Sequence, residues 1–168
     1  MADGLRLFFL RHGPADRDQY QGDDDDLRPL TDAGRRRMRV TADFVAGLDP
    51  GLDAVITSPL LRAAETAEIV ATRLGLTDEL TVDPRLGLGF DLPDLAAILA
   101  GLAQDHRRIL LVGHEPSFSL VVGELTGGSH VTMKKGALAR VDLPYGGSPR
   151  GELIWLLQPR VLLSGDRG

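Results

Sequence analysis

The chain has 168 residues and a formal net charge of −5, from 19 Lys and Arg against 24 Asp and Glu. This length fits one domain with a sizeable core, and the acidic balance argues against general nucleic-acid binding, which needs a basic face. There is no cysteine, so disulfides, thiolate nucleophiles and sulfur-based zinc sites are excluded. No apolar run approaches the ~20 residues that span a bilayer, and we expect a soluble, cytoplasmic protein.

The chain begins with a strand pattern and then a helix pattern. Residues 5–10 form a short apolar run that is closed by Arg11-His12-Gly13-Pro14, which indicates a strand followed by a break. Four consecutive aspartates at residues 23–26 predict a solvated loop rather than a metal site. Thr31 has the side chain of an N-cap, and the pattern after it predicts a helix as far as Gly47.

The same alternation follows in the second quarter. Residues 54–57 are a short apolar strand. Ser58 as N-cap and Pro59 at the first helical position predict the start of a helix, and apolar residues at spacings of three and four continue it to near Gly75. Residues 80–82 are a weaker strand.

The second half completes the pattern. A helix is predicted over residues 91–103 and an apolar strand over residues 109–112, followed by a helix over residues 116–125. Residues 139–143 and 152–157 form an antiparallel hairpin pattern. The alternation predicts an α/β fold of three layers, α/β/α, with a mainly parallel central sheet and a closing β-hairpin. We expect one domain over residues 1–160 and a C-terminal tail over residues 161–168.

Polar side chains follow three of the predicted strands. Arg11 and His12 come after the first strand, Arg62 lies in the first helical turn after the second, and His114 follows the fourth. Ligands of open α/β sheets bind at the carboxyl ends of the parallel strands. Each residue alone has an ordinary structural interpretation, such as a solvated arginine or a capped core histidine. Together at one edge, the four favour a functional site.

This combination suits a phosphoryl group. Arginine forks match phosphate oxygens at two points and stay charged. Helix N-termini add backbone N–H donors for an anion. A histidine among such cations has a lowered pKa, which leaves a ring nitrogen free to attack phosphorus.

Three ordered motifs carry a resemblance to a known family. Arg11-His12-Gly13, the segment 58–66 (SPLLRAAET) and the segment 112–116 (VGHEP) resemble the motifs of the histidine phosphatase superfamily, the phosphoglycerate mutase-like proteins. The small size and the segment 28–34 (RPLTDAG) resemble its SixA branch, the short phosphohistidine phosphatases. The likeness extends to about Leu157.

The resemblance implies specific roles. His12 would be the nucleophile and pass through a phosphohistidine intermediate, Arg11 and Arg62 would clamp the phosphoryl oxygens, and His114 would donate to an oxygen in the transition state. Arg28 lies in the SixA-like segment and is either a further phosphate contact or a surface arginine. Relatives of this kind need no metal or other cofactor, since arginines supply the positive charge.

The general acid is the weak point of the pattern. SixA-like proteins commonly show Pro-Glu-Leu after the third strand, whereas this chain has Arg85 there. Asp91 could reach a leaving group or a substrate, but an N-cap of the next helix is the stronger interpretation, and Glu115 is a weaker candidate for the same role. An alkoxide leaving group needs a proton, whereas a protonated phosphoramidate leaves as neutral imidazole. The difference from the family pattern at Arg85 therefore favours phosphohistidine as the substrate over a phosphate ester.

We therefore expect a metal-independent phosphatase that acts on phosphohistidine in a protein. A phosphomonoesterase for a small phosphorylated metabolite is the alternative, and a non-catalytic phosphate-binding module comes third. The short segments between the motifs leave little chain for a lid, which predicts an open site.

Overall fold

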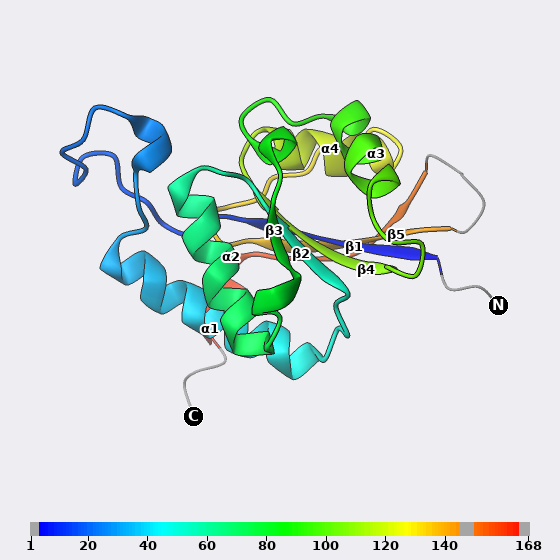
Figure 1. Cartoon of the computed structure of the whole chain (residues 1–168), viewed down its shortest axis with the longest axis horizontal. Coiled ribbons are helices and arrows are strands. Elements are labelled where there is room, and N and C mark those ends of the chain that lie inside the picture. The colour runs from blue at the N-terminus through cyan, green and yellow to red at the C-terminus, as the bar shows by residue number, and fades with distance from the viewer. Residues whose placement is uncertain (1–3, 145–149, 165–168) are drawn as a thin grey trace.

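A six-stranded sheet forms the centre of the computed structural model, which describes residues 4–144 and 150–164 (Figure 1). The strands lie in the order β3-β2-β4-β1-β5-β6. Their bounds are β1 Leu5–Arg11, β2 Ala54–Thr57, β3 Leu80–Val82, β4 Arg108–Gly113, β5 Leu138–Leu143 and β6 Glu152–Leu157. The first four in that order are parallel, whereas β5 is antiparallel to β1 and β6 to β5. The mainly parallel sheet with a closing hairpin is thus confirmed.

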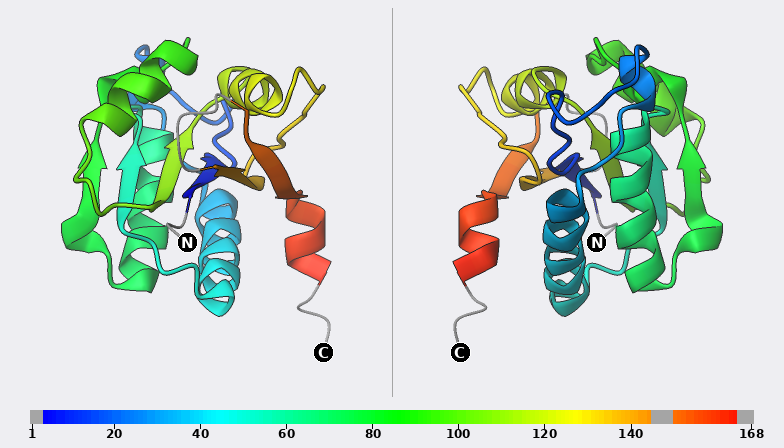
Figure 2. Two further views of the ribbon diagram at one scale, coloured as in Figure 1. Left: turned by 90° about the vertical axis from the view of Figure 1, so that its right-hand side faces the viewer. Right: turned by 90° about the vertical axis from the view of Figure 1, so that its left-hand side faces the viewer.

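Helices cover both faces of this sheet (Figure 2). Helices α1 and α2 pack on one face, and α3 and α4 pack on the other. The described α-helices are α1 Asp32–Leu48, α2 Leu61–Leu74, α3 Leu92–Ala100, α4 Ser117–Leu125 and α5 Pro159–Ser164. The described 3-10 turns are η1 Asp25–Leu27, η2 Thr77–Glu79 and η3 Pro84–Leu86. The three-layer prediction is confirmed.

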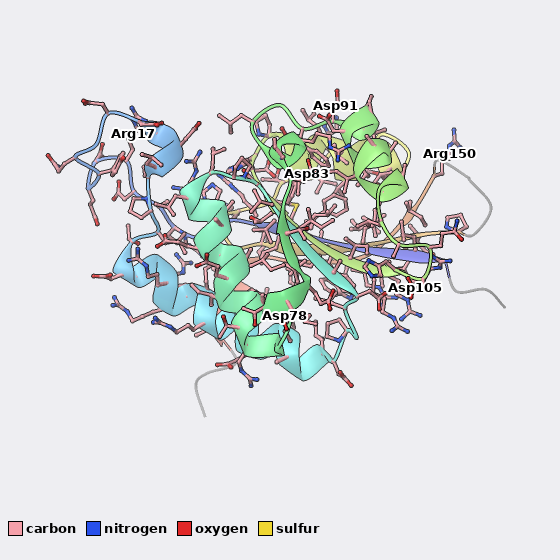
Figure 3. All side chains as sticks on the ribbon, viewed as in Figure 1. Arg17, Asp78, Asp83, Asp91, Asp105 and Arg150 are labelled. Atoms are coloured by element: carbon pink, nitrogen blue, oxygen red, sulfur yellow. The ribbon has the colours of Figure 1, made fainter. Side chains whose placement is uncertain are left out.

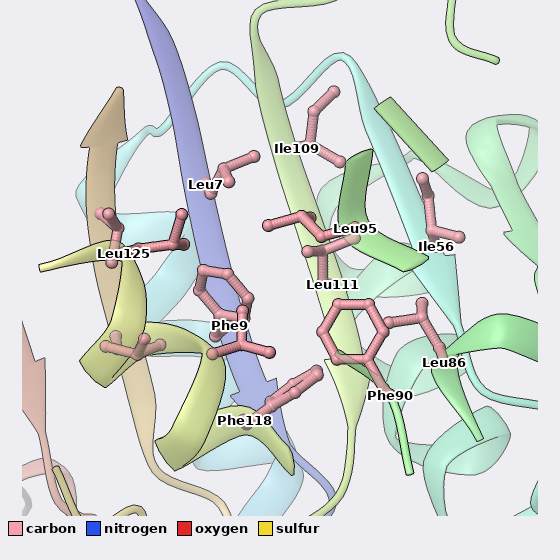
Figure 4. Packing of buried hydrophobic residues seen from close by; sticks show 14 of the residues in the cluster. Leu7, Phe9, Ile56, Leu86, Phe90, Leu95, Ile109, Leu111, Phe118 and Leu125 are labelled. Carbon is pink, nitrogen blue, oxygen red and sulfur yellow. The ribbon is translucent and has the colours of Figure 1, made fainter. Parts of the chain in front are cut away.

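The apolar runs become central strands because both of their faces are buried. Successive side chains of a strand point to opposite faces, so Leu7 and Phe9 enter the core under α3 and α4 (Figure 4), while Phe8 and Leu10 enter the core under α1 and α2. The ring of Phe118 from α4 meets that of Phe9 edge-on, with centroids 5.3 Å apart. Burial on both sides leaves only the strand ends for polar chemistry.

Helix boundaries follow the expected capping signals with one exception. The side chain of Thr31 accepts a hydrogen bond from the backbone N–H of Gly34, as an N-cap does. Helix α3 ends at Ala100, with Gly101 as its C-cap, rather than at residue 103. Ser58 is not an N-cap: α2 begins later, and its N-cap position is Leu60, whose side chain makes no capping hydrogen bond. Ser58 and Pro59 instead lie in the short segment that joins β2 to α2, so that prediction was wrong.

The end of the described chain forms a helix that the sequence patterns did not predict. Helix α5 packs against α1 through a segment that includes the buried Leu162. The tail predicted over residues 161–168 therefore begins inside α5, and residues 165–168 lie outside the described residues. None of the helices in the described ranges combines the length and apolar character that a membrane span requires.

Candidate active site

Strands β1 and β4 bring two histidines together at the carboxyl edge of the sheet. The strands are parallel neighbours with Arg11 paired to Gly113, and the backbone N–H of His12 donates to the carbonyl of Gly113 at 3.0 Å. The residues that follow each strand are therefore adjacent. The rings of His12 and His114 lie with centroids 5.3 Å apart, and both residues are buried.

Two arginines frame these histidines. Arg62 projects from the first turn of α2 and is only 4% exposed. Arg11 ends β1 and donates from Nη1 to the carbonyl of Met133 at 2.8 Å. The positive charges of both arginines act on His12 and on His114. The structure thus brings together all four residues for which the sequence predicts catalytic roles.

The backbone sets the proton position on His12. Its Nδ1 lies 2.7 Å from the carbonyl oxygen of Gly13. A carbonyl oxygen only accepts, so Nδ1 must carry the proton and Nε2 keeps its lone pair. The N–H of Gly13 donates to Thr66 Oγ1 at 3.1 Å, which anchors this turn to α2. The ring is therefore held with a nucleophilic nitrogen available.

Burial keeps both histidines neutral. It lowers the pKa of His12 to about 3. Electrostatic repulsion from His114, Arg62 and Arg11 adds to the effect, and the hydrogen bond to the Gly13 carbonyl opposes it. Burial is also the main reason that the pKa of His114 falls to about 4, followed by the charges of the arginines. Neutral imidazoles dominate near pH 7. Nε2 of His12 is therefore unprotonated near pH 7.

Several polar nitrogens of the site lack partners inside the protein. In the described part of the chain, Nε of Arg11, Nε of Arg62 and Nδ1 of His114 are buried without a hydrogen bond. Nε2 of His114 shares a 2.7 Å hydrogen bond with the hydroxyl of Ser58, which orients the ring. A buried polar group without a partner costs about 1–3 kcal/mol. The oxygens of a phosphoryl group are acceptors that suit the two guanidinium donors.

The acidic loop lies closer to this site than its composition indicated. Asp25 in η1 pairs with Arg17, and its two carboxylate oxygens accept from Nε and Nη2 of Arg28 at 2.9 and 3.4 Å. Its carbonyl accepts from Nη1 of Arg62 at 2.9 Å, and Oδ2 lies 3.5 Å from Nη2 of the same arginine. The solvated-loop prediction is therefore wrong for Asp25. The turn lies against the start of α2 (Figure 1), so the site is more covered than we expected.

Arg28 is linked to the site by the carboxylate of Asp25, which lies between Arg28 and Arg62. Its Nη1 donates to the carbonyl of Ala15, while the rest of its fork faces Asp25. Its positive charge contributes to the lowered pKa of both Arg62 and His114. Arg28 thus adds positive potential, and its contact with substrate stays a prediction.

The two carboxylates considered as acids occupy different places. Oε1 of Glu115 accepts from the N–H of Ser119 at 3.2 Å, and its charge acts on Arg11. Asp91 caps α3 by accepting from the N–H of Asp94 at 3.0 Å and lies at the periphery of the helical layer (Figure 3). No interaction within residues 4–144 and 150–164 joins Asp91 to the histidines. Over the same ranges, no three His, Asp or Glu side chains gather in a way that could hold a metal ion.

Comparisons with known proteins match this geometry. The family model of the histidine phosphatase superfamily (branch 1) matches residues 7–87. The chain is 31% identical to the phosphohistidine phosphatase SixA of Escherichia coli over 92% of this chain and 94% of SixA. The chain belongs to the histidine phosphatase superfamily.

Other relatives agree with this assignment. A solved structure of the protein histidine phosphatase SixA with tungstate has a TM-score of 0.83 and 30% identity, over 94% of this chain and 99% of that one. An uncharacterized protein of Picosynechococcus sp. is 34% identical over 95% of this chain and 99% of its own length. The protein is accordingly a phosphatase of the SixA-like type with the phosphoglycerate mutase-like fold.

Within this phosphatase, three supporting residues escaped the sequence-based selection. Ser58 orients His114, Thr66 holds Gly13, and Asp25 joins the arginines. Ser58 and Thr66 both belong to the second motif, so the motif itself was the available signal. Asp25 carried no such signal, because it stands among four identical residues.

Proposed function

We propose that this phosphatase removes the phosphoryl group from a phosphohistidine side chain of a protein. The observation that carries the proposal is the buried, neutral His12, whose Nδ1 is bonded to the Gly13 carbonyl and whose Nε2 therefore keeps its lone pair. It lies beside His114, within the field of Arg11 and Arg62. The relationship to SixA, which is named as a phosphohistidine phosphatase, supports the same substrate class.

The reaction has two displacement steps. Nε2 of His12 attacks phosphorus as the phosphorus–nitrogen bond of the substrate breaks, and the leaving imidazole carries away a proton as neutral histidine. Water then attacks the phosphorus on His12, releasing inorganic phosphate and restoring the free imidazole. In both steps the guanidinium groups of Arg11 and Arg62 neutralise charge on the equatorial oxygens. The arginines supply the positive charge, so the scheme uses no metal ion.

The leaving group distinguishes this substrate from a phosphate ester. An alkoxide needs a proton from a general acid as it departs, whereas a phosphohistidine protonated on its ring leaves as a neutral imidazole. Asp91 is occupied as a helix cap, and Glu115 accepts a backbone hydrogen bond. These assignments favour the phosphoramidate over the ester of a small metabolite.

A direct test uses purified protein without added metal. We expect phosphate release from a phosphohistidine peptide to exceed release from an alkyl phosphate ester in kcat/KM. His12→Ala should abolish both activities, and His130→Ala, at an exposed loop position, should retain them. Rapid acid-free quenching with labelled substrate should also trap a phosphoryl group on the wild type that is stable in alkali.

The outcomes separate the alternatives. Full activity in His12→Ala would exclude the nucleophilic role. Faster turnover of the ester would instead identify a phosphomonoesterase. Tight phosphate binding without turnover or labelling would identify a binding module.

A further inference from the structure

A cationic groove lies beside the phosphate site, and of its lining residues only Arg11 acts in the proposed reaction. It has a volume of about 740 Å³, and five of its nine lining residues are cations: Arg11, Arg37, Lys134, Lys135 and Arg160. The remaining lining residues include no carboxylate. Such a concentration of one charge in a protein of net charge −5 creates a local potential that attracts a polyanion.

Apart from Arg11, on which the charge of Glu115 acts, the cations of this groove have no ion-pair partner among the described residues. Across the described ranges, no carboxylate forms an ion pair with Arg37, Lys134, Lys135 or Arg160. Other arginines, such as Arg73 and Arg140, do pair with nearby carboxylates. Both lysines and Arg160 are exposed, whereas Arg37 is half-buried. Their positive charge is therefore available to a partner.

The groove has a defined shape because its walls are bonded together. The side chain of Gln158 accepts from the N–H of Lys134 at 3.1 Å and donates to the carbonyl of Thr132 at 2.6 Å. These two bonds fix the loop that carries the lysines to the end of β6. Helix α5, which carries Arg160, lies alongside α1, which carries Arg37 (Figure 2), so these two helices form the remaining walls of the groove.

The groove adjoins the catalytic residues at Arg11. The N–H of Gly136, directly after the two lysines, donates to the carbonyls of Arg11 and His12 at 3.1 and 3.0 Å. Arg11 lines the groove and bonds to the carbonyl of Met133 in its wall. A chain segment in the groove would therefore lie against Arg11, the residue directly before His12.

The chemistry of the walls selects the kind of occupant. Aromatic side chains, on which nucleotide bases stack, do not line this groove. Flexible lysines and arginines distributed over several chain segments suit several separate carboxylates rather than one compact anion. We propose that the cationic groove binds an acidic segment that flanks the phosphohistidine of the protein substrate. This inference rests on the proposed function and adds how the substrate protein is selected.

The test compares two phosphohistidine peptides that differ only in their flanking residues, aspartate and glutamate in one and asparagine and glutamine in the other. For the wild type we expect KM to be about tenfold lower for the acidic peptide, a ratio that corresponds to about 1.4 kcal/mol from exposed ion pairs. The preference should decrease with added salt, because exposed charges are screened. The double variant Lys134→Ala/Lys135→Ala should lose most of the preference with kcat unchanged.

A matched control removes two positive charges elsewhere. Arg36→Ala/Arg39→Ala changes exposed positions on α1 that do not line the groove, and it should keep the preference. Equal KM values for the two peptides in the wild type would overturn the groove inference while leaving the proposed function intact. An equal rise in KM for both peptides in the lysine variant would also overturn it, since the lysines would then act on the phosphoryl group itself. Absence of hydrolysis of any phosphohistidine substrate by the wild type would instead refute the proposed function, and the inference with it.

Discussion

The buried neutral histidines should make the stability of this protein depend on pH in a predictable direction. The pKa of His12 is lowered to about 3 in the folded state, against about 6.5 in an unfolded chain. As pH falls below 6.5, the unfolded chain therefore binds a proton that the folded chain does not. Stability is fully present above that pH and is lost progressively until the pH reaches the folded pKa.

The size of the effect follows from the same values. A pH of 5 lies about 1.5 units below the unfolded pKa of His12, and each unit corresponds to about 1.36 kcal/mol. The protonation of His12 in the unfolded chain should therefore lower the free energy of unfolding by about 2 kcal/mol at pH 5. His114, with a folded pKa of about 4, should add a similar loss. The variant His12→Asn removes one titrating group and keeps a side-chain N–H that can face the Gly13 carbonyl. We expect it to lose about 2 kcal/mol less than the wild type between pH 8 and pH 5.

Urea unfolding provides the measurement. The chain has one tryptophan, the half-buried Trp155 on β6, whose ring lies 6.0 Å from that of Phe8 and should report unfolding by fluorescence. Phosphate must be left out of the buffer, because a bound anion stabilises the folded state by mass action. The exposed His130→Asn variant is the control and should follow the wild type. If wild type and His12→Asn lose the same stability from pH 8 to pH 5, the assignment of a buried, neutral His12 is refuted.

Three further substitutions test the surroundings of the site. Gly13→Ala would place a Cβ 2.5 Å from Cγ of the buried Met38, so we expect its free energy of unfolding, measured in urea, to fall by about 1–3 kcal/mol. The control Gly47→Ala has open space around the added Cβ and should be neutral or stabilising. Asp25→Asn removes a carboxylate that competes for the arginines and should lower the Kd for inorganic phosphate about threefold by calorimetry; an unchanged Kd would contradict that competition. Asp91→Ala should cost about 1 kcal/mol of stability as a lost N-cap and leave kcat for phosphohistidine unchanged, and a large fall in kcat would restore Asp91 as an acid.

The sequence patterns predicted the sheet and most helices, because these elements depend mainly on residues that are close together in the chain. The apolar runs at β1 and β4 are buried on both faces, and Thr31 caps the helix that it precedes. The short α5 escaped prediction because a six-residue helix depends on packing against α1 rather than on its own propensity. The error at Ser58 has the same origin: its hydroxyl serves His114, which is 56 positions away in the chain.

The candidate site also has residues that the sequence could predict and one residue that it could not. His12, His114 and the two framing arginines could be predicted because each lies at or shortly after the end of a strand, and parallel strands end at one edge. The role of Asp25 could not, because its partner Arg62 lies 37 positions away and is reached only when the loop folds over α2. Composition predicted a solvated acidic loop, whereas the Asp25 carboxylate pairs with Arg17 and Arg28 and its carbonyl accepts a hydrogen bond from the distant Arg62.

The electrostatic design of the site connects burial with the choice of substrate. Burial is the largest cause of the low pKa of His12, so the exclusion of water from this ring keeps it neutral well below pH 7. A carboxylic acid buried in the same way would stay uncharged and could donate a proton. Asp91, however, is exposed, and the side chain of Glu115 accepts a hydrogen bond from the backbone of α4. A substrate whose leaving group brings its own proton, as a protonated phosphohistidine does, needs no such donor. The arrangement of the described residues therefore supports the proposed cleavage of a phosphorus–nitrogen bond over that of a phosphorus–oxygen bond to an alkyl group.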